Sequence, residues 1–146
     1  MRTIEFRGKV KYNGYYLFTG DWVFGSLIQR SNYTCIYVIE LDEFGNIVRE
    51  FEVEVHPETV GMFTGLHDKN GVKIFEGDRV KHTVNHSIYD GNQQKNRVIN
   101  SVVFWSDFRA AFALQMNNFY NNDLYNYVRN GGDAEVIGNI HEGGEK

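Results

Sequence analysis

The stretch TGLHDKNGVKIFEGDRV, residues 64–80, combines three glycines and three acidic residues with short apolar runs. Its Asn70-Gly71 pair lies between two apolar runs, which is the pattern of a tight β-hairpin because both residues tolerate positive φ. Gly77 separates the second run from a third and allows another sharp bend, where Asp78 can accept bonds from nearby backbone amides. A calcium loop needs acidic ligands alternating over about twelve residues, and this stretch lacks that pattern. It therefore predicts strand turns rather than a ligand loop.

The rest of the chain repeats this alternation of turns and short apolar runs. Glycines recur at short intervals among 146 residues, proline occurs once, and 15% of the residues are aromatic. Runs of this kind, rich in β-branched and aromatic residues, are typical of an all-β sandwich or small barrel. The expected strands lie near residues 4–6, 15–18, 22–28, 34–41, 47–55, 61–66, 72–75, 79–84, 97–105, 111–116 and 135–140.

One or two short helical segments interrupt this β pattern. Pro57 can start a single helical turn at residues 57–60, because proline suits the first helical position. The i,i+4 spacing of Tyr120 and Leu124 predicts a short helix at about 120–129, which Gly131-Gly132 would end. The turn at 57–60 divides the chain into an N-terminal β lobe, residues 1–60, and a C-terminal lobe, residues 61–146.

Period-two patterns predict the buried faces of the strands. Trp22 and Phe24 would share one strand face, and Val102 and Phe104 another, so we expect them in buried clusters together with Phe112. The single cysteine, Cys35, lies in an apolar run and is expected to be a small core residue without a disulfide.

Charge is spread unevenly over the chain, whose net charge is −4. Residues 40–58 hold seven acidic residues against one arginine, whereas residues 69–97 hold six basic residues against three acidic ones. A mixed solvated surface explains this distribution most simply. In a nucleic-acid-binding alternative, the cations on both sides of the polar loop 85–96 would clamp phosphates; these are Arg79, Lys81, Lys95 and Arg97.

No catalytic or cofactor motif is present in the sequence. His82 and His86 are four residues apart, a spacing that suits a metal only on a helix, and they lie where a strand is expected. Neither a nucleophile elbow nor a glycine-rich phosphate loop occurs. We therefore expect no enzyme, no metal and no cofactor. No run of about 18 apolar residues occurs either, so no membrane span is expected.

Several motifs, in this order, resemble the YopX family of bacteriophages and prophages. They are Glu5–Lys9, Pro57–Gly61, Phe63–Leu66, Asp68–Gly71, Glu76-Gly77-Asp78 with Val80, and Val136–Ile140. The resemblance implies a β-rich fold: an SH3-like, partly open barrel in the C-terminal part, preceded by an N-terminal β meander. The N-terminal MRTIEFRGK has no apolar signal segment and the chain has one cysteine, so we expect it in a reducing cytoplasm. The resemblance implies that this is the cytoplasm of a host bacterium. The family is functionally uncharacterised, so no catalytic residue can be carried over.

Two functions of different class remain open. The first is an accessory protein that acts through protein–protein interaction, as a homo-oligomer or with an unknown phage or host protein, because charge patches of opposite sign can meet across subunits. The alternative is a weak nucleic-acid-binding SH3-like module, in which exposed aromatic residues would stack on bases. The acidic stretch 40–58 counts against this alternative, so nucleic-acid binding is expected to be weak or absent.

Overall fold

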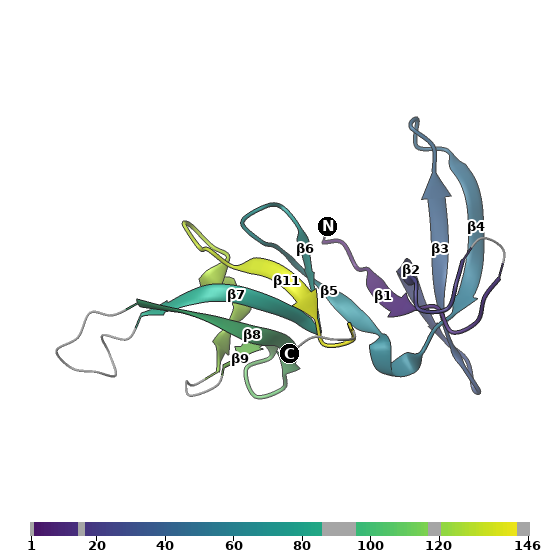
Figure 1. The fold of residues 1–146 in the computed structure, drawn as a ribbon. Coiled ribbons are helices and arrows are strands. Elements are labelled where there is room, and N and C mark those ends of the chain that lie inside the picture. The colour runs from purple at the N-terminus through teal and green to yellow at the C-terminus, as the bar shows by residue number, and fades with distance from the viewer. Residues whose placement is uncertain (1, 15–16, 86–95, 117–120, 143–146) are drawn as a thin grey trace. The chain divides into compact units, whose positions relative to one another are not determined.

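The computed structural model describes residues 2–14, 17–85, 96–116 and 121–142 (Figure 1). The chain forms two compact units, Met1–Phe63 and Thr64–Lys146. The strands form antiparallel sheets, and the only helical segments among the described residues are two single 3₁₀ turns. The all-β class is therefore confirmed, while the SH3-like barrel and the division at residue 60 stay predictions.

The first unit is an antiparallel meander. Its strands are β1 (Phe6–Lys9), β2 (Trp22–Gln29), β3 (Thr34–Leu41), β4 (Ile47–Glu54) and the start of β5 (Gly61–His67), with the 3₁₀ turn η1 (Pro57–Thr59) before β5. Hydrogen bonding follows the order β4-β3-β2-β1-β5, so β4 is an edge strand. The strand expected at 15–18 does not form at Leu17, which makes only an isolated bridge to Gly14. Residues 15–16 lie outside the described residues.

The core of the first unit packs against the face of β2 that carries Val23, and the prediction had placed it on the face of Trp22 and Phe24. Val23 is buried there, with Val10, Ile36, Val53 and Val55 around it. Trp22 is only half-buried, and Phe24 is 44% exposed. The prediction for Trp22 and Phe24 was therefore wrong, because three consecutive large apolar residues leave the face undecided. Cys35 is buried, as expected.

The second unit continues β5 and adds β6 (Lys73–Phe75), β7 (Asp78–Asn85), β8 (Asn96–Ser106), β9 (Ala111–Gln115), β10 (Asn122–Asp123), η2 (Leu124–Tyr127) and β11 (Glu135–Asn139). Five of these strands form an open antiparallel sheet in the order β10-β9-β8-β7-β11, and β6 neighbours β5. The helix expected at 120–129 is reduced to the four residues of η2. Asparagine is a poor helix former, and the Asn122 side chain instead accepts from the Asp123 amide, at 2.8 Å.

The hairpin predicted at Asp68–Gly71 is present between β5 and β6, but its turn differs in detail. The Asp68 amide donates to the Val72 carbonyl at 2.8 Å, and the Gly71 amide donates to the Asp68 carbonyl at 3.0 Å. Only Gly71 of the Asn-Gly pair has a positive φ, of 82°. The loop is thus a three-residue turn that ends in a left-handed glycine.

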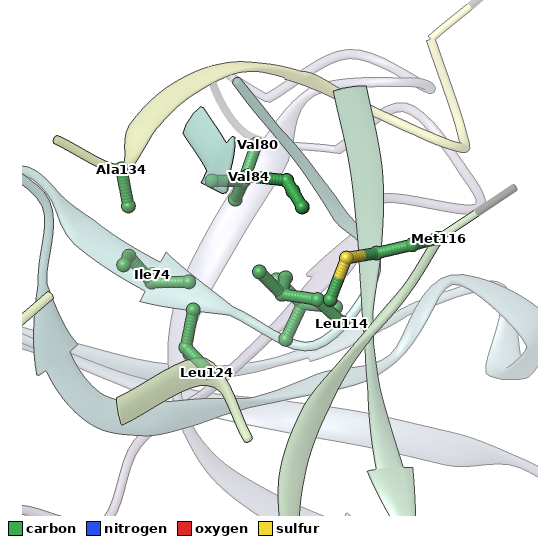
Figure 2. Packing of buried hydrophobic residues seen from close by; sticks show 8 residues of the cluster. Ile74, Val80, Val84, Leu114, Met116, Leu124 and Ala134 are labelled. Atoms are coloured by element: carbon green, nitrogen blue, oxygen red, sulfur yellow. The ribbon is translucent and has the colours of Figure 1, made fainter. Parts of the chain in front are cut away.

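The core of the second unit lies under β7, β8 and β9. Figure 2 shows side chains of this cluster, whose buried members are Ile74, Val80, Val84, Val103, Leu114, Met116, Leu124 and Ala134. On β8 the buried apolar residue is Val103, whereas Val102 and Phe104 are half-buried, so the predicted face was wrong here too. Phe112 packs against the cluster, as expected.

Candidate functional site

The β3–β4 hairpin ends in a segment that we call the hairpin tip, residues Ile39–Val48. Five large apolar side chains in these ten residues are exposed: Ile39, Leu41, Phe44, Ile47 and Val48. Phe44, at the loop between the strands, is 79% exposed. Figure 1 shows the loop at the end of the paired strands β3 and β4. The register places Leu41 directly opposite Ile47, so these two share one face, and exposed apolar groups that adjoin in this way are typical of an interaction surface.

Local hydrogen bonds fix the loop of the hairpin tip. The Asp42 carboxylate accepts from the Phe44 and Asn46 amides, both at 2.9 Å, and Gly45 has a φ of 85°. Burial acts to raise the pKa of Asp42, but the hydrogen bond from the Asn46 amide is a larger influence and the net pKa is lowered. Asp42 is therefore ionised at neutral pH, and its carboxylate holds Phe44 outward in a defined turn.

The acidic residues of the same hairpin are paired within the unit. Glu40 lies 2.6 Å from Arg49, and Glu52 lies 2.6 Å from Arg30. Glu54 lies 3.4 Å from Lys11, and the Tyr37 hydroxyl donates to Glu50. The ion pairs offset the charges of Glu40, Glu52 and Glu54, so this row of glutamates follows from strand alternation and cross-strand pairing rather than from acid–base chemistry.

The cations predicted to clamp phosphates do not share one face of the sheet. Arg79 and Lys81 lie on β7 and Arg97 on β8, while Lys95 lies outside the described residues. The register places Arg97 opposite the buried Val84, and residues directly opposite each other share a face. By alternation, Arg79 and Lys81 lie on the other face. Lys81 also pairs with Glu135 at 3.6 Å.

A polar pocket of about 630 Å³ opens in the second unit, and we call it the asparagine pocket. Its walls come from the end of β7 (Thr83 and Val84), from Asn122, Asn126 and Tyr127 around η2, and from residues 129–133. Sequence reasoning assigned this asparagine-rich region to a helix and missed the pocket. The short polar side chains that break the helix are the same ones that line the cavity.

A network of hydrogen bonds holds the pocket walls. The Thr83 amide and hydroxyl donate to the two Asp133 oxygens, at 3.1 and 2.5 Å. The Asn122 side chain accepts from the Asn126 amide group at 2.9 Å and donates to the Tyr127 hydroxyl at 3.3 Å. Burial acts to raise the pKa of Asp133, but the hydrogen bonds from Thr83, together with smaller effects of the Asp133 backbone and His82, lower the pKa overall. The pocket wall therefore carries an ionised carboxylate.

His82 lies in the core next to this wall, as a buried neutral residue. Its side chain is fully buried, its Nε2 lies 2.7 Å from the Ser101 hydroxyl, and its ring is 4.5 Å from the Tyr127 ring. Burial lowers the pKa of His82 against smaller opposing effects of the Thr83 backbone and Asp133. The period-two spacing of Val80, His82 and Val84 is the sequence signal that places it on the core face. His86 lies outside the described residues.

A second exposed aromatic surface lies at the turn between β8 and β9. Phe108 is 97% exposed there, and Trp105 packs edge-on against Phe112 with ring centroids 5.2 Å apart. The Trp105 indole donates to Asp107 at 2.8 Å, while Arg109 pairs with Asp123 at 3.1 Å. Phe108 and the 46% exposed Trp105 are both exposed rings of this turn, and their neighbours Asp107 and Arg109 are charged. Phe108 therefore serves as a control for Phe44.

Two findings cover only the residues that the structure describes. No three His, Cys, Asp or Glu side chains among them lie close enough together to hold a metal ion. Within the same ranges, no helix has the length and apolar character needed to cross a membrane. The absence of a metal, a cofactor and catalysis stays a prediction.

Comparison with known proteins identifies the family but not an activity. No curated protein matches the chain. Among solved structures, the chain is similar to the crystal structure of protein EF1440 from Enterococcus faecalis, with a TM-score of 0.51 and 21% identity over 97% of this chain and 95% of that one. This likeness shows a shared fold. A profile of the YopX protein family matches residues 5–146, essentially the whole length, and the chain therefore belongs to the YopX family.

Proposed function

We propose that this chain is a non-enzymatic accessory protein that acts by binding another protein through its hairpin tip, and that its first partner is a second copy of itself. The observation that carries the proposal is the group of five exposed apolar side chains between residues 39 and 48. The phage or prophage origin, an additional phage or host partner and the host bacterial cytoplasm are parts of the proposal that rest on the family alone.

The hairpin tip has two properties that favour protein binding. Phe44 is an aromatic side chain that can enter a pocket, and aromatic anchors carry much of the binding free energy at interfaces. The bonds from the Phe44 and Asn46 amides to Asp42 fix the loop before binding, which lowers the conformational entropy lost on association.

The charge of the hairpin favours self-association, with a second copy of the chain as the partner. Three of the four carboxylates of β3 and β4 are paired with cations of their own unit and the fourth, Glu50, accepts from the Tyr37 hydroxyl, so the strands beside the tip carry little uncompensated charge. In a symmetric dimer each tip would contact the same tip of the partner. Apolar area, rather than charge, would then supply most of the association free energy.

Light scattering after size exclusion tests the proposal. We expect the wild type to show a mass above the 16.9 kDa of one chain, and the double variant Leu41→Ser/Phe44→Ser to return to 16.9 kDa. The control Phe108→Ser removes a still more exposed ring from the β8–β9 turn and should keep the wild-type mass. A monomeric wild type, or a tip variant that still associates, would contradict the proposal.

Weak nucleic-acid binding is the alternative, and one observation favours it. Arg79 and Lys81 share a face of β7, where they can contact neighbouring phosphates. A binding curve with a single-stranded oligonucleotide at several salt concentrations tests it, because phosphate contacts make affinity fall steeply with salt. If a monomeric wild type binds the oligonucleotide and Arg79→Gln/Lys81→Gln abolishes this, the ranking of the two functions is reversed.

A further inference from the structure

We infer that the asparagine pocket of the second unit is a binding site for a small neutral carbohydrate. This site is separate from the hairpin tip and does not depend on the proposed function. Its volume, about 630 Å³, lies within the range of small-ligand pockets, roughly 300–1,000 Å³. What distinguishes it from most such pockets is that polar side chains form most of its lining.

The lining matches the chemistry of hydroxyl groups. Each sugar hydroxyl both donates and accepts hydrogen bonds, and a carboxamide side chain does the same with its NH₂ group and its oxygen. The side-chain oxygen of Asn126 and the side-chain amide of Asn130 make no hydrogen bond to another described residue. Both groups can therefore hydrogen-bond to a ligand. Asp133 retains lone pairs beyond those used by Thr83.

The charge of the lining favours a neutral ligand over an anion. Among the described residues of the lining, Arg129 is the one cation and the ionised Asp133 is the one acid. A phosphate or a carboxylate at this site would gain one positive charge and meet one negative charge, with little net attraction. An apolar ligand is disfavoured too, since it would cover amide groups without hydrogen-bonding to them.

Local hydrogen bonds and close packing define the backbone around the pocket. The Ala134 amide donates to the Tyr127 carbonyl at 3.1 Å, and the Gly132 amide donates to the Arg129 carbonyl at 2.6 Å. A Cβ at Gly132 would lie 2.3 Å from the Tyr127 oxygen, so the chain passes where a side chain has no room. A site fixed in this way loses little entropy when a ligand enters.

Titration of the ¹⁵N-labelled protein with sugars, followed by amide NMR, tests the inference. The probes are glucose, galactose, mannose, xylose, N-acetylglucosamine, maltose and lactose. We expect at least one probe to shift the amides of residues 122–133 with a Kd in the millimolar range. Asn126→Ala and Asn130→Ala should each weaken binding about fivefold, the effect of one hydrogen bond. The control Asn100→Ala changes an exposed asparagine on β8 and should leave binding unchanged.

Three results would overturn the inference. These are no shift with any probe at 100 mM, shifts that Asn100→Ala weakens as much as Asn126→Ala does, and saturable binding of adenosine monophosphate at this site in place of every sugar. The tip variant Leu41→Ser/Phe44→Ser should bind the sugar as the wild type does. Failure of the protein-binding proposal and failure of this inference are therefore distinguishable.

Discussion

Two hairpin loops of this protein have the same local structure and different surroundings. The loop Asp42–Asn46 joins β3 and β4, and the loop Asp68–Val72 joins β5 and β6. In each, the aspartate carboxylate accepts from the amides two and four residues later, at 2.8–2.9 Å. In each, the glycine three residues after the aspartate has a φ near 85°, measured as 85° at Gly45 and 82° at Gly71.

The difference lies in the second oxygen of each carboxylate. Asp68 is 6% exposed, and its other oxygen accepts from the Val136 amide of β11 at 2.9 Å. Asp42 is exposed, and its other oxygen contacts only the Asn46 side chain, at 3.4 Å. The shared Asp-x-x-Gly sequence thus determines the turn, whereas contacts distant in sequence determine whether the turn ties a sheet together or presents Phe44 to water.

The largest expected difference between the two loops comes from removal of the aspartates. Asp68→Ala leaves the amides of Asn70, Val72 and Val136 without their acceptor, so we expect the second unit to lose about 3 kcal/mol of stability. Asp42→Ala should cost clearly less, because water reaches the freed amides. Urea unfolding, followed through the amide NMR signals of each unit, measures both. Equal losses at the two positions would contradict the comparison.

Substitution of the two glycines should instead have nearly equal effects. A Cβ at Gly45 or Gly71 would meet no heavy atom within 4 Å, so the cost comes only from the positive φ. A β-branched residue resists that conformation, and Gly71→Val and Gly45→Val should each destabilise by about 1–2 kcal/mol. The same urea experiment checks this result. A much larger loss at Gly71 would mean that packing, rather than the turn, governs that site.

Protonation of Asp68 should make the second unit less stable at low pH. Burial acts to raise the pKa of Asp68, but the amides of Val136, Val72 and Asn70 together lower it below its usual value. A lowered folded pKa contributes stability above the unfolded pKa of about 3.9, and this contribution is lost as pH falls through the folded pKa. The stability gap between the wild type and Asp68→Asn should therefore be largest above about pH 5 and shrink toward pH 3. A constant gap would argue against this linkage.

His82 should also make the stability of the second unit depend on pH. The effect should be smaller than that of Asp68 and fall at a higher pH. Its folded pKa is lowered by burial, so the unfolded chain binds a proton more readily than the folded one. Stability should therefore decrease as pH falls below about 6.5, the ordinary pKa of histidine. His82 belongs to the second unit, so the stability of the first unit, which holds the exposed loop at Asp42, should not show this decrease through His82. Unfolding of the wild type and His82→Gln at pH 7.5 and 5.5 tests this, because the variant should lose the decrease in the second unit.

Local patterns in the sequence predicted the turns and most strands, and they failed where tertiary contacts decide. The strand at Thr34–Leu41 has the predicted bounds, because turn residues flank a clear apolar run. The predictions of the buried faces of β2 and β8 were wrong. The runs Trp22-Val23-Phe24 and Val102-Val103-Phe104 are apolar at every position, so alternation cannot choose between the two faces of each strand.

The candidate sites depended even more on contacts that the sequence does not reveal. That Arg97 lies on the opposite face from Arg79 follows only from the register of β7 with β8. The asparagine pocket needs Thr83 to come together with Asn122–Asp133, up to 50 positions later in the sequence. The hairpin tip is a different case: its apolar residues are visible in the sequence, but their exposure depends on which elements pack against β3 and β4.

The smallest effect on stability, and the sharpest test of the comparison, is expected from the third position of each loop. Phe44 and Asn70 occupy this position, and both are exposed. Phe44→Asn makes the two loops alike there and removes no buried contact, so the unfolding free energy should change by less than about 0.5 kcal/mol. Because Phe44 supplies the largest exposed ring of the tip, the same variant should show a mass nearer to one chain by light scattering. The reverse change, Asn70→Phe, should leave both stability and mass as in the wild type, since that loop has one exposed apolar residue, Val72, where the hairpin tip has four besides Phe44. If Asn70→Phe promoted association as strongly as Phe44 does, any exposed aromatic ring would suffice, and the hairpin tip would have no special role in binding.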